Sequence, residues 1–227
     1  MIKLFETIKN IFSIEELRDR IINTVFFLII FRLGSFVVLP GIDPSKLQQS
    51  AGGIFGLLDT FLGGAFSNAS IFALGIMPYI SASIVVQLLG VALPYFQKLQ
   101  KEGDSGRKKM TQITRYLTIV ICLFQSTAYI SGTIPAEAIL VQNKFLFTIS
   151  SLVILTSGTI FCMWLGEKIT DKGIGNGISM LIMIGIISRF PGSIVAEALS
   201  RGMNQALFFL IEIGVLFLVV MFTIMLV

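Results

Sequence analysis

Long apolar stretches separated by short polar segments make up most of this chain of 227 residues. A helix needs roughly 20 mostly apolar residues to cross the hydrocarbon core of a bilayer. Several stretches approach that length, and together they predict an all-α polytopic membrane protein, a bundle of helices that crosses the bilayer repeatedly. The predicted spans are residues 21–39, 71–93, 111–131, 145–165, 178–188 and 206–227.

The apolar segment at about residues 54–66 differs from these spans because it is too short to cross a bilayer and is rich in glycine. We predict a short re-entrant helix that ends at Gly63 and Gly64, since glycine commonly follows the last turn of a helix. No charged residue occurs between Asp59 and Lys98. Non-helical backbone at membrane depth is tolerated only beside protein or a water-filled cavity. The segment therefore predicts a cavity.

The chain divides into three parts by this pattern. Residues 1–20 are amphipathic, and Ser13 begins a sequence with the form of a capping box, which predicts a cytosolic surface helix. Residues 21–188 hold spans one to five, with Arg32 near the end of the first, where an arginine can extend toward the headgroups. Residues 189–227 hold a polar outer loop and span six. That span lacks a basic flank, which suggests a truncated chain.

Composition and charge support a lipid environment and an orientation in it. The chain is 55% hydrophobic and 13% charged, with a mean hydropathy of +0.89 and a net charge of +4. If the N-terminus is cytosolic, twelve lysines and arginines lie on cytosolic segments and four on outer loops. Cytosolic loops carry the excess of these cations. We therefore expect a multi-pass protein of the cytoplasmic (inner) membrane with its N-terminus in the cytosol.

No residue pattern supports catalysis or a cofactor. Histidine is absent, which removes the commonest general base and metal ligand. The two cysteines, Cys122 and Cys162, lie in apolar stretches without disulfide or metal-site spacing. Gly173, Gly175 and Gly177 do not form a dinucleotide fingerprint, because no strand precedes them and the spacing differs. We expect neither an enzyme nor a bound cofactor or metal.

Four groups of segments closely resemble SecY, the channel-forming subunit of the bacterial Sec protein translocon. They are GGAFSNASIFALGIMPYISASI at 63–84, RLGS and PGID at 32–35 and 40–43, KEGDSGR at 101–107, and WLGE and GIGNGIS at 164–167 and 173–179. The resemblance extends over the whole chain. It implies a ten-span channel of two inverted halves, of which this chain supplies the first half and one span of the second. Independent activity is therefore not expected.

The resemblance also implies a pore ring at Ile76, Ile80, Ile182 and Ile186. An apolar constriction of this kind blocks ions by excluding water. The sequence allows the role, because Ile76, Ile80 and Ile84 recur every four positions and share one helical face. Spacing alone favours ordinary helix packing, so the role follows from the resemblance.

The re-entrant segment is implied to be a plug that closes the channel and moves away during transport. Glycine pairs on both sides of it adopt hinge conformations at little steric cost. A static re-entrant helix is the alternative. The implied plug residues are Ile54, Phe55, Leu58, Phe61, Leu62, Gly63 and Gly64.

A lateral gate and a cytosolic contact surface are implied in the same way. For the two glutamines of the gate, the alternative is a local hydrogen bond to a neighbouring carbonyl. For the basic residues, the alternatives are topology signals and contacts to lipid headgroups. The gate residues are Ile84, Gln87 and Gln125, and the basic residues are Arg107, Lys108 and Lys109.

The implied function is that of a protein-conducting channel subunit, which translocates unfolded preproteins across the cytoplasmic membrane and releases membrane proteins laterally into it. The implied partners are SecE and SecG, the SecA motor or the ribosome on the cytosolic face, signal peptides and preproteins, and membrane lipids. The alternative is a secondary transporter for a small solute or ion, which usually needs a coupling carboxylate or histidine in the membrane. Asp59 and Glu212 are the candidates for it, and both are poor.

Overall fold

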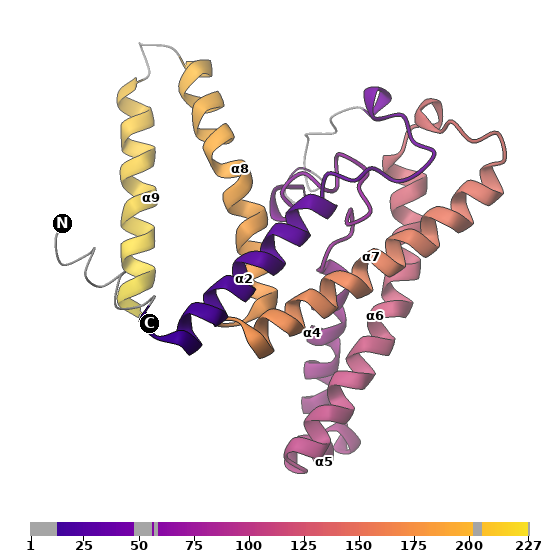
Figure 1. The fold of residues 1–227 in the computed structure, drawn as a ribbon, viewed down its shortest axis with the longest axis vertical. Helices are drawn as coiled ribbons and strands as arrows, with labels where there is room; N and C mark the ends of the chain where they lie inside the picture. Colours follow the sequence, from indigo (N-terminus) through magenta and orange to yellow (C-terminus); the bar gives the residue numbers. More distant parts are fainter. Residues whose placement is uncertain (1–12, 48–55, 57–58, 202–205, 227) are drawn as a thin grey trace. The chain divides into compact units, whose positions relative to one another are not determined.

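The computed structural model describes residues 13–47, 56, 59–201 and 206–226. In these ranges the regular structure is helical (Figure 1). The described residues form two isolated β-bridges but no strand, which confirms the all-α prediction. The helices are α2 (Glu15–Gly34), α4 (Met77–Ala92), α5 (Pro94–Lys101), α6 (Asp104–Thr133), α7 (Lys144–Lys172), α8 (Gly177–Arg201) and α9 (Ala206–Leu226), with short 3₁₀ helices η1 (Pro44–Lys46) and η2 (Ala136–Ala138).

The chain forms two compact units, Met1–Ile186 and Ile187–Val227, with the division inside α8. The candidate site lies in the first. In the second, the described residues of α9 from Leu210 onward are exposed and largely apolar. Such a helix is stable where its solvent is lipid.

Within the described residues, four helices are long and apolar enough to cross a membrane, namely α6, α7, α8 over Gly177–Glu197 and α9 over Phe209–Leu226. A fifth candidate is the pair of α4 and α5, which is bent by 99°. The 16 residues of α4 extend only about 24 Å. Pro94 then starts α5 in a new direction, because proline has no N–H with which to continue the hydrogen-bond ladder of α4.

The first helix differs from its prediction at both ends. It runs unbroken from Glu15, across the predicted boundary at residue 20, and its N-cap is Ile14 rather than Ser13. Two glutamates in the first turn favour this start, since acidic groups stabilise the positive end of a helix dipole. The helix also ends at Gly34, before the predicted residue 39. The chain beyond it turns at Ser35 and Phe36, and Val38 then forms an antiparallel bridge with Ser70.

The second span begins later than predicted, at Met77 instead of residue 71, because residues 62–76 form successive turns. Gly63, Gly64 and Gly75 have φ values of 61°, 94° and 51°, which a regular helix does not contain. This irregular backbone is enclosed by protein. A Cβ atom at Gly158 of α7 would collide with a carbonyl oxygen of the segment, and Pro78 at the start of α4 is fully buried.

Three segments predicted as polar loops are largely helical. Within residues 98–115 only a turn at Glu102 and Gly103 separates α5 from α6, and α7 extends to Lys172 through most of the segment 166–177. Residues 189–201, predicted to belong to a polar outer loop, continue α8 as a helix with Pro191 inside it. Lysine, glutamate and alanine are good helix formers. Polarity in these segments therefore marks where a helix leaves the apolar layer, not where it ends.

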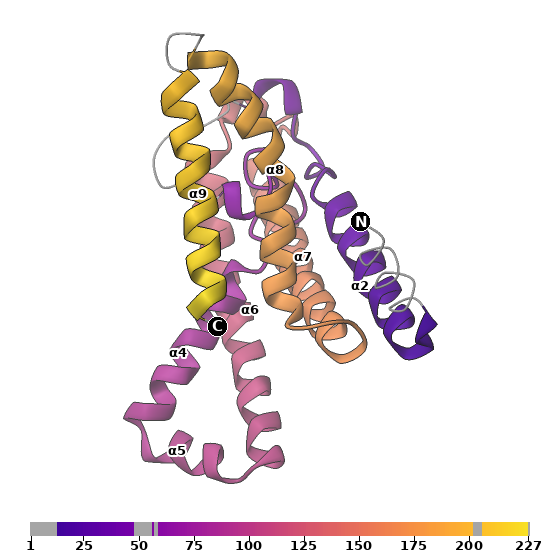
Figure 2. The ribbon, with the colours of Figure 1, turned by 90° about the vertical axis from the view of Figure 1, so that its left-hand side faces the viewer.

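Helices α4 and α6 lie side by side and α5 joins their ends, as Figure 2 shows. Helix α6 also packs on α7, where the Sγ atom of Cys122 lies 3.4 Å from Oγ1 of Thr159. The buried ring of Phe72 stacks between those of Phe31 and Phe161, with centroids 6.0 and 5.8 Å away. These contacts anchor the turn segment against α2 and α7.

Candidate functional site

A small cavity of about 230 Å³ lies where α2, α4 and α8 meet the end of the re-entrant segment. The described residues that line it all have apolar side chains, so the space repels ions and favours dewetting. Three of the four predicted ring residues and two predicted plug residues line it together. The lining residues are Phe31, Phe61, Leu62, Ile76, Met77, Ile80, Leu181 and Ile182.

The four ring residues differ in burial. Ile76 is 4% exposed and packs in the core cluster that contains Phe72, whereas Ile80 and Ile182 are partly buried beside the cavity. Ile186, one turn beyond Ile182 on α8, is also partly buried but does not line the cavity. The structure therefore places three of the four isoleucines around one space.

The carboxyl-terminal part of the predicted plug, residues 59–66, is called here the plug end. It begins with a helical turn that ends at Gly63 and Gly64, where the Gly64 N–H donates to the Asp59 carbonyl over 3.0 Å. Leu62 is buried and Phe61 is 44% exposed. The other predicted plug residues, Ile54, Phe55 and Leu58, lie outside the described residues.

Two charged side chains tie the plug end to its surroundings through backbone groups. The buried carboxylate of Asp59 accepts a hydrogen bond from the Ser67 N–H over 2.8 Å. The guanidinium of Arg32, on α2, donates from Nη1 to the Gly63 carbonyl oxygen over 3.1 Å. Sequence reasoning missed this role of Arg32, although a charged residue within a span is itself a signal of function.

Two glycines allow the plug end to approach its neighbours closely. A Cβ atom on Gly185 of α8 would collide with the carbonyl oxygen of Phe61. A Cβ atom on Gly75 would collide with the Leu62 side chain, and Gly75 also has a left-handed φ of 51°. Sequence reasoning gave Gly185 no role, because a lone glycine in an apolar helix carries no signal of what it faces.

The predicted gate residues are not gathered in one place. Ile84 and Gln87 are exposed on α4, and Gln87 donates from Nε2 to the hydroxyl of Ser83, one turn earlier, over 3.1 Å. Gln125 instead lines a second cavity of about 280 Å³ between the plug end, α4 and α6. The hydroxyl of Tyr129 bounds that cavity and donates to the Phe66 carbonyl over 2.7 Å.

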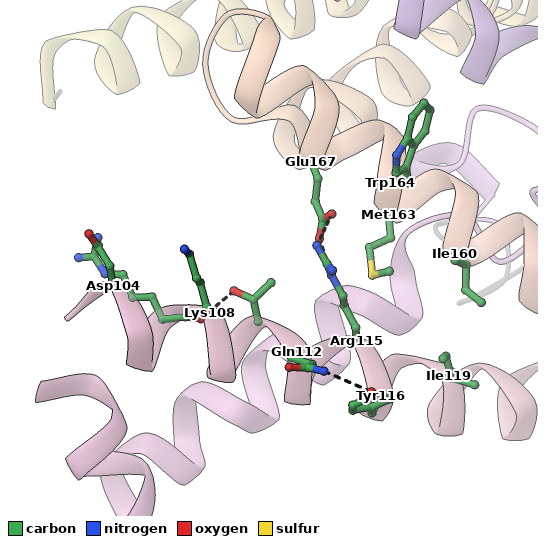
Figure 3. A pocket seen from close by; sticks show the side chains of 12 residues that line it. Asp104, Lys108, Gln112, Arg115, Tyr116, Ile119, Ile160, Met163, Trp164 and Glu167 are labelled. Atoms are coloured by element: carbon green, nitrogen blue, oxygen red, sulfur yellow. Dashed lines mark hydrogen bonds and ion pairs between the residues drawn. The ribbon is translucent and has the colours of Figure 1, made fainter. Parts of the chain in front are cut away.

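The predicted basic residues are exposed at the start of α6, and Arg107 and Lys108 line an open cleft of about 930 Å³ against the end of α7. Lys109 pairs with Glu102 over 3.4 Å. In Figure 3, Arg115 and Glu167 point toward one another across the cleft, and their two hydrogen bonds measure 3.0 and 2.6 Å. A cationic rim above apolar side chains suits a lipid headgroup or an acidic loop.

Comparison with known proteins decides the family. The family model described as SecY matches residues 70–227, which is more than half of the chain. The chain belongs to the SecY family. It is 46% identical over 214 residues to the protein translocase subunit SecY of Buchnera aphidicola from Schizaphis graminum, covering 90% of this chain and 49% of that protein. The SecY subunit of Escherichia coli is 45% identical over 211 residues, covering 90% and 47%.

Solved structures show the same fold at lower identity. A chain of the canine ribosome-channel complex from the endoplasmic reticulum and the structure of a protein conducting channel each align with a TM-score of 0.58 and 19% identity, covering 84% of this chain and 41% of the other. A structure reported for the plug domain of SecY aligns at 0.52, with 20% identity over 76% and 36%. The SecY-type membrane fold is therefore confirmed. The chain spans about half the length of the SecY relatives it matches.

Proposed function

We propose that this chain forms the first half of a protein-conducting channel, which translocates unfolded preproteins across the cytoplasmic membrane and releases membrane proteins laterally into it. The observation that carries the proposal is the apolar cavity where Ile76, Ile80 and Ile182 meet the plug end. Family membership makes a channel the natural use of such a cavity. The secondary-transporter alternative has no comparable support.

The cavity suits a barrier that must open for a polypeptide and stay closed to ions. A hydrated ion gains nothing from isoleucine and leucine side chains that could replace its water shell. A passing polypeptide can displace the plug end and then contact the same side chains. In this proposal Ile76, Ile80, Ile182 and Ile186 form the constriction, and Phe61 and Leu62 close it.

The arrangement of helix ends supports the cytosolic orientation of the N-terminus. The Arg115–Glu167 pair brings the cationic start of α6 beside the end of α7. Thr24, in the middle of α2, accepts a hydrogen bond over 3.0 Å from the N–H of Ile174, in the loop between α7 and α8. Arg20, one turn earlier in α2, donates to the Gly173 carbonyl in the same loop over 3.4 Å. Three segments rich in lysine and arginine thus gather at one end of the first unit, as the cytosolic side requires.

The partners follow from the same proposal. SecE and SecG would surround the channel, and SecA or the ribosome would contact the cytosolic end, where Arg107, Lys108 and Lys109 are exposed. Signal peptides would enter through a lateral gate between α4, α6 and the second half of the channel. Ile84, Gln87 and Gln125 would face that gate. No catalytic role and no cofactor is proposed.

Export in cells tests the function directly. We define the complete channel as this chain together with the second half that the proposal requires. In bacteria depleted of their own SecY, the complete channel is expected to restore signal-peptide removal from a preprotein, measured by pulse-chase labelling, whereas residues 1–227 alone are not. Full membrane insertion of the complete channel without any restored processing would contradict the proposal, and uptake of a small solute instead would favour the transporter.

A further inference from the structure

We propose that Arg32 is a positioning residue that holds the plug end on α2 in the closed channel. The inference rests on the proposed function, because it assumes that the plug end moves. It is carried by one tertiary hydrogen bond, by the local conformation at Gly63, and by the chain neighbours Phe31 and Leu62, which line the apolar cavity.

The contact joins two elements that are distant in the sequence. Arg32 lies in the last turn of α2, and its Nη1 atom donates over 3.1 Å to the carbonyl oxygen of Gly63, 31 residues later. The Cζ atom of Arg32 also lies 5.2 Å from the ring centroid of Phe36, one turn further along the chain. A cation–π contact of this kind orients the guanidinium. The donor is therefore held toward the plug end.

The accepting carbonyl is one that needs a partner. Gly63 follows the helical turn of the plug end and has a φ of 61°, which ends that turn. Gly63 is buried, and a buried backbone carbonyl without a hydrogen-bond partner is costly. Arginine suits the position because it stays charged and offers five N–H donors in a planar fork.

The bond lies next to the side chains that close the cavity. Leu62 precedes Gly63 and Phe31 precedes Arg32, and both of these neighbours line the cavity with Ile80. Holding the Gly63 carbonyl therefore fixes Leu62 against the constriction. When the plug end leaves, this hydrogen bond from a charged donor to a buried carbonyl is broken, which costs free energy. The contact thus favours the closed channel.

The test measures where the plug end lies. In the complete channel, a cysteine replaces Phe61 and is labelled from the outer side with a membrane-impermeant maleimide, while resting conductance is recorded in planar bilayers. Both native cysteines are buried. Arg32→Gln is expected to raise the labelling rate and the resting conductance roughly 10-fold, since a hydrogen bond from a charged donor is lost. Arg32→Lys, which keeps one charged donor, is expected to raise them less.

A second substitution separates a positioning role from general damage. Gly185→Ala is expected to displace the plug end by itself, so adding Arg32→Gln to it should change labelling by less than twofold. Labelling within twofold of the unsubstituted channel in both Arg32 variants overturns the inference, whatever their Tm. Full additivity of Arg32→Gln and Gly185→Ala overturns it as well.

Ile80→Asp distinguishes this inference from the proposed function. If Ile80→Asp conducts ions and neither Arg32 variant changes labelling, the role of Arg32 is wrong while the channel proposal stands. If Ile80→Asp does not conduct ions and the unsubstituted complete channel transports no preprotein, the proposed function itself fails.

Discussion

The complete channel with Ile80→Asp is expected to conduct ions at rest, at least about tenfold more than the unsubstituted channel, because a carboxylate in the constriction brings water into it. Ile80 lines the apolar cavity with Ile76 and Ile182, and among the described lining residues no polar side chain could bind the water already. Single-channel recording in planar bilayers, without any preprotein, measures the effect.

Two control substitutions show whether the leak depends on polarity at that place. Ile80→Leu keeps the constriction apolar and should leave the resting conductance within about twofold of the original. Ile149→Asp introduces the same carboxylate at an exposed position of α7, which does not line the cavity, and should not conduct. Equal conductance of Ile80→Asp and Ile149→Asp would show that Ile80 is not part of the pore ring.

Gly185→Ala is expected to displace the plug end from α8. A Cβ atom at this position would collide with the Phe61 carbonyl oxygen, and the backbone atoms of Phe61 cannot turn away as a flexible side chain can. Overpacking of this kind costs about 1–3 kcal/mol, which here acts against the closed state alone. We therefore expect the resting conductance, and the labelling of a cysteine at Phe61, to rise roughly 5- to 150-fold.

Gly192→Ala is the matched control for this substitution. It introduces the same methyl group into the same helix, but no atom of the described part of the chain lies within 4 Å of the Cβ position. Labelling and conductance should stay unchanged in it. If Gly185→Ala stays as tightly closed as Gly192→Ala, the plug end does not pack on α8 in the way described.

The sequence predicted where apolar helices lie better than where they end. The charged stretch at 98–115 was expected to be a loop, yet Lys98 and Lys101 are in α5 and Arg107 is in α6. Hydropathy distinguishes lipid from water but does not distinguish a helix in water from a loop. The start of α4 was missed for a different reason. Residues 71–76 are apolar enough for a span, and tertiary packing against Gly158 and around the Phe72 ring holds them in turns.

The candidate site shows the same division between what a pattern indicates and what packing decides. Isoleucine spacing and the resemblance to SecY were sufficient to single out Ile76, Ile80 and Ile182, which line one cavity. Neither indicated Arg32 or Gly185. Both act on backbone carbonyls of the plug end, and a carbonyl has no residue identity that a sequence pattern could record.

The central claim is that a polypeptide passes through the space lined by these isoleucines. A photo-crosslinking amino acid placed at Ile182 of the complete channel, with a preprotein halted in transit by a folded domain, tests it most directly. Crosslinks to the halted preprotein are expected at Ile182 and not at the exposed Ile149. A halted preprotein that forms no crosslink at Ile182, or forms equal amounts at both positions, would contradict the account.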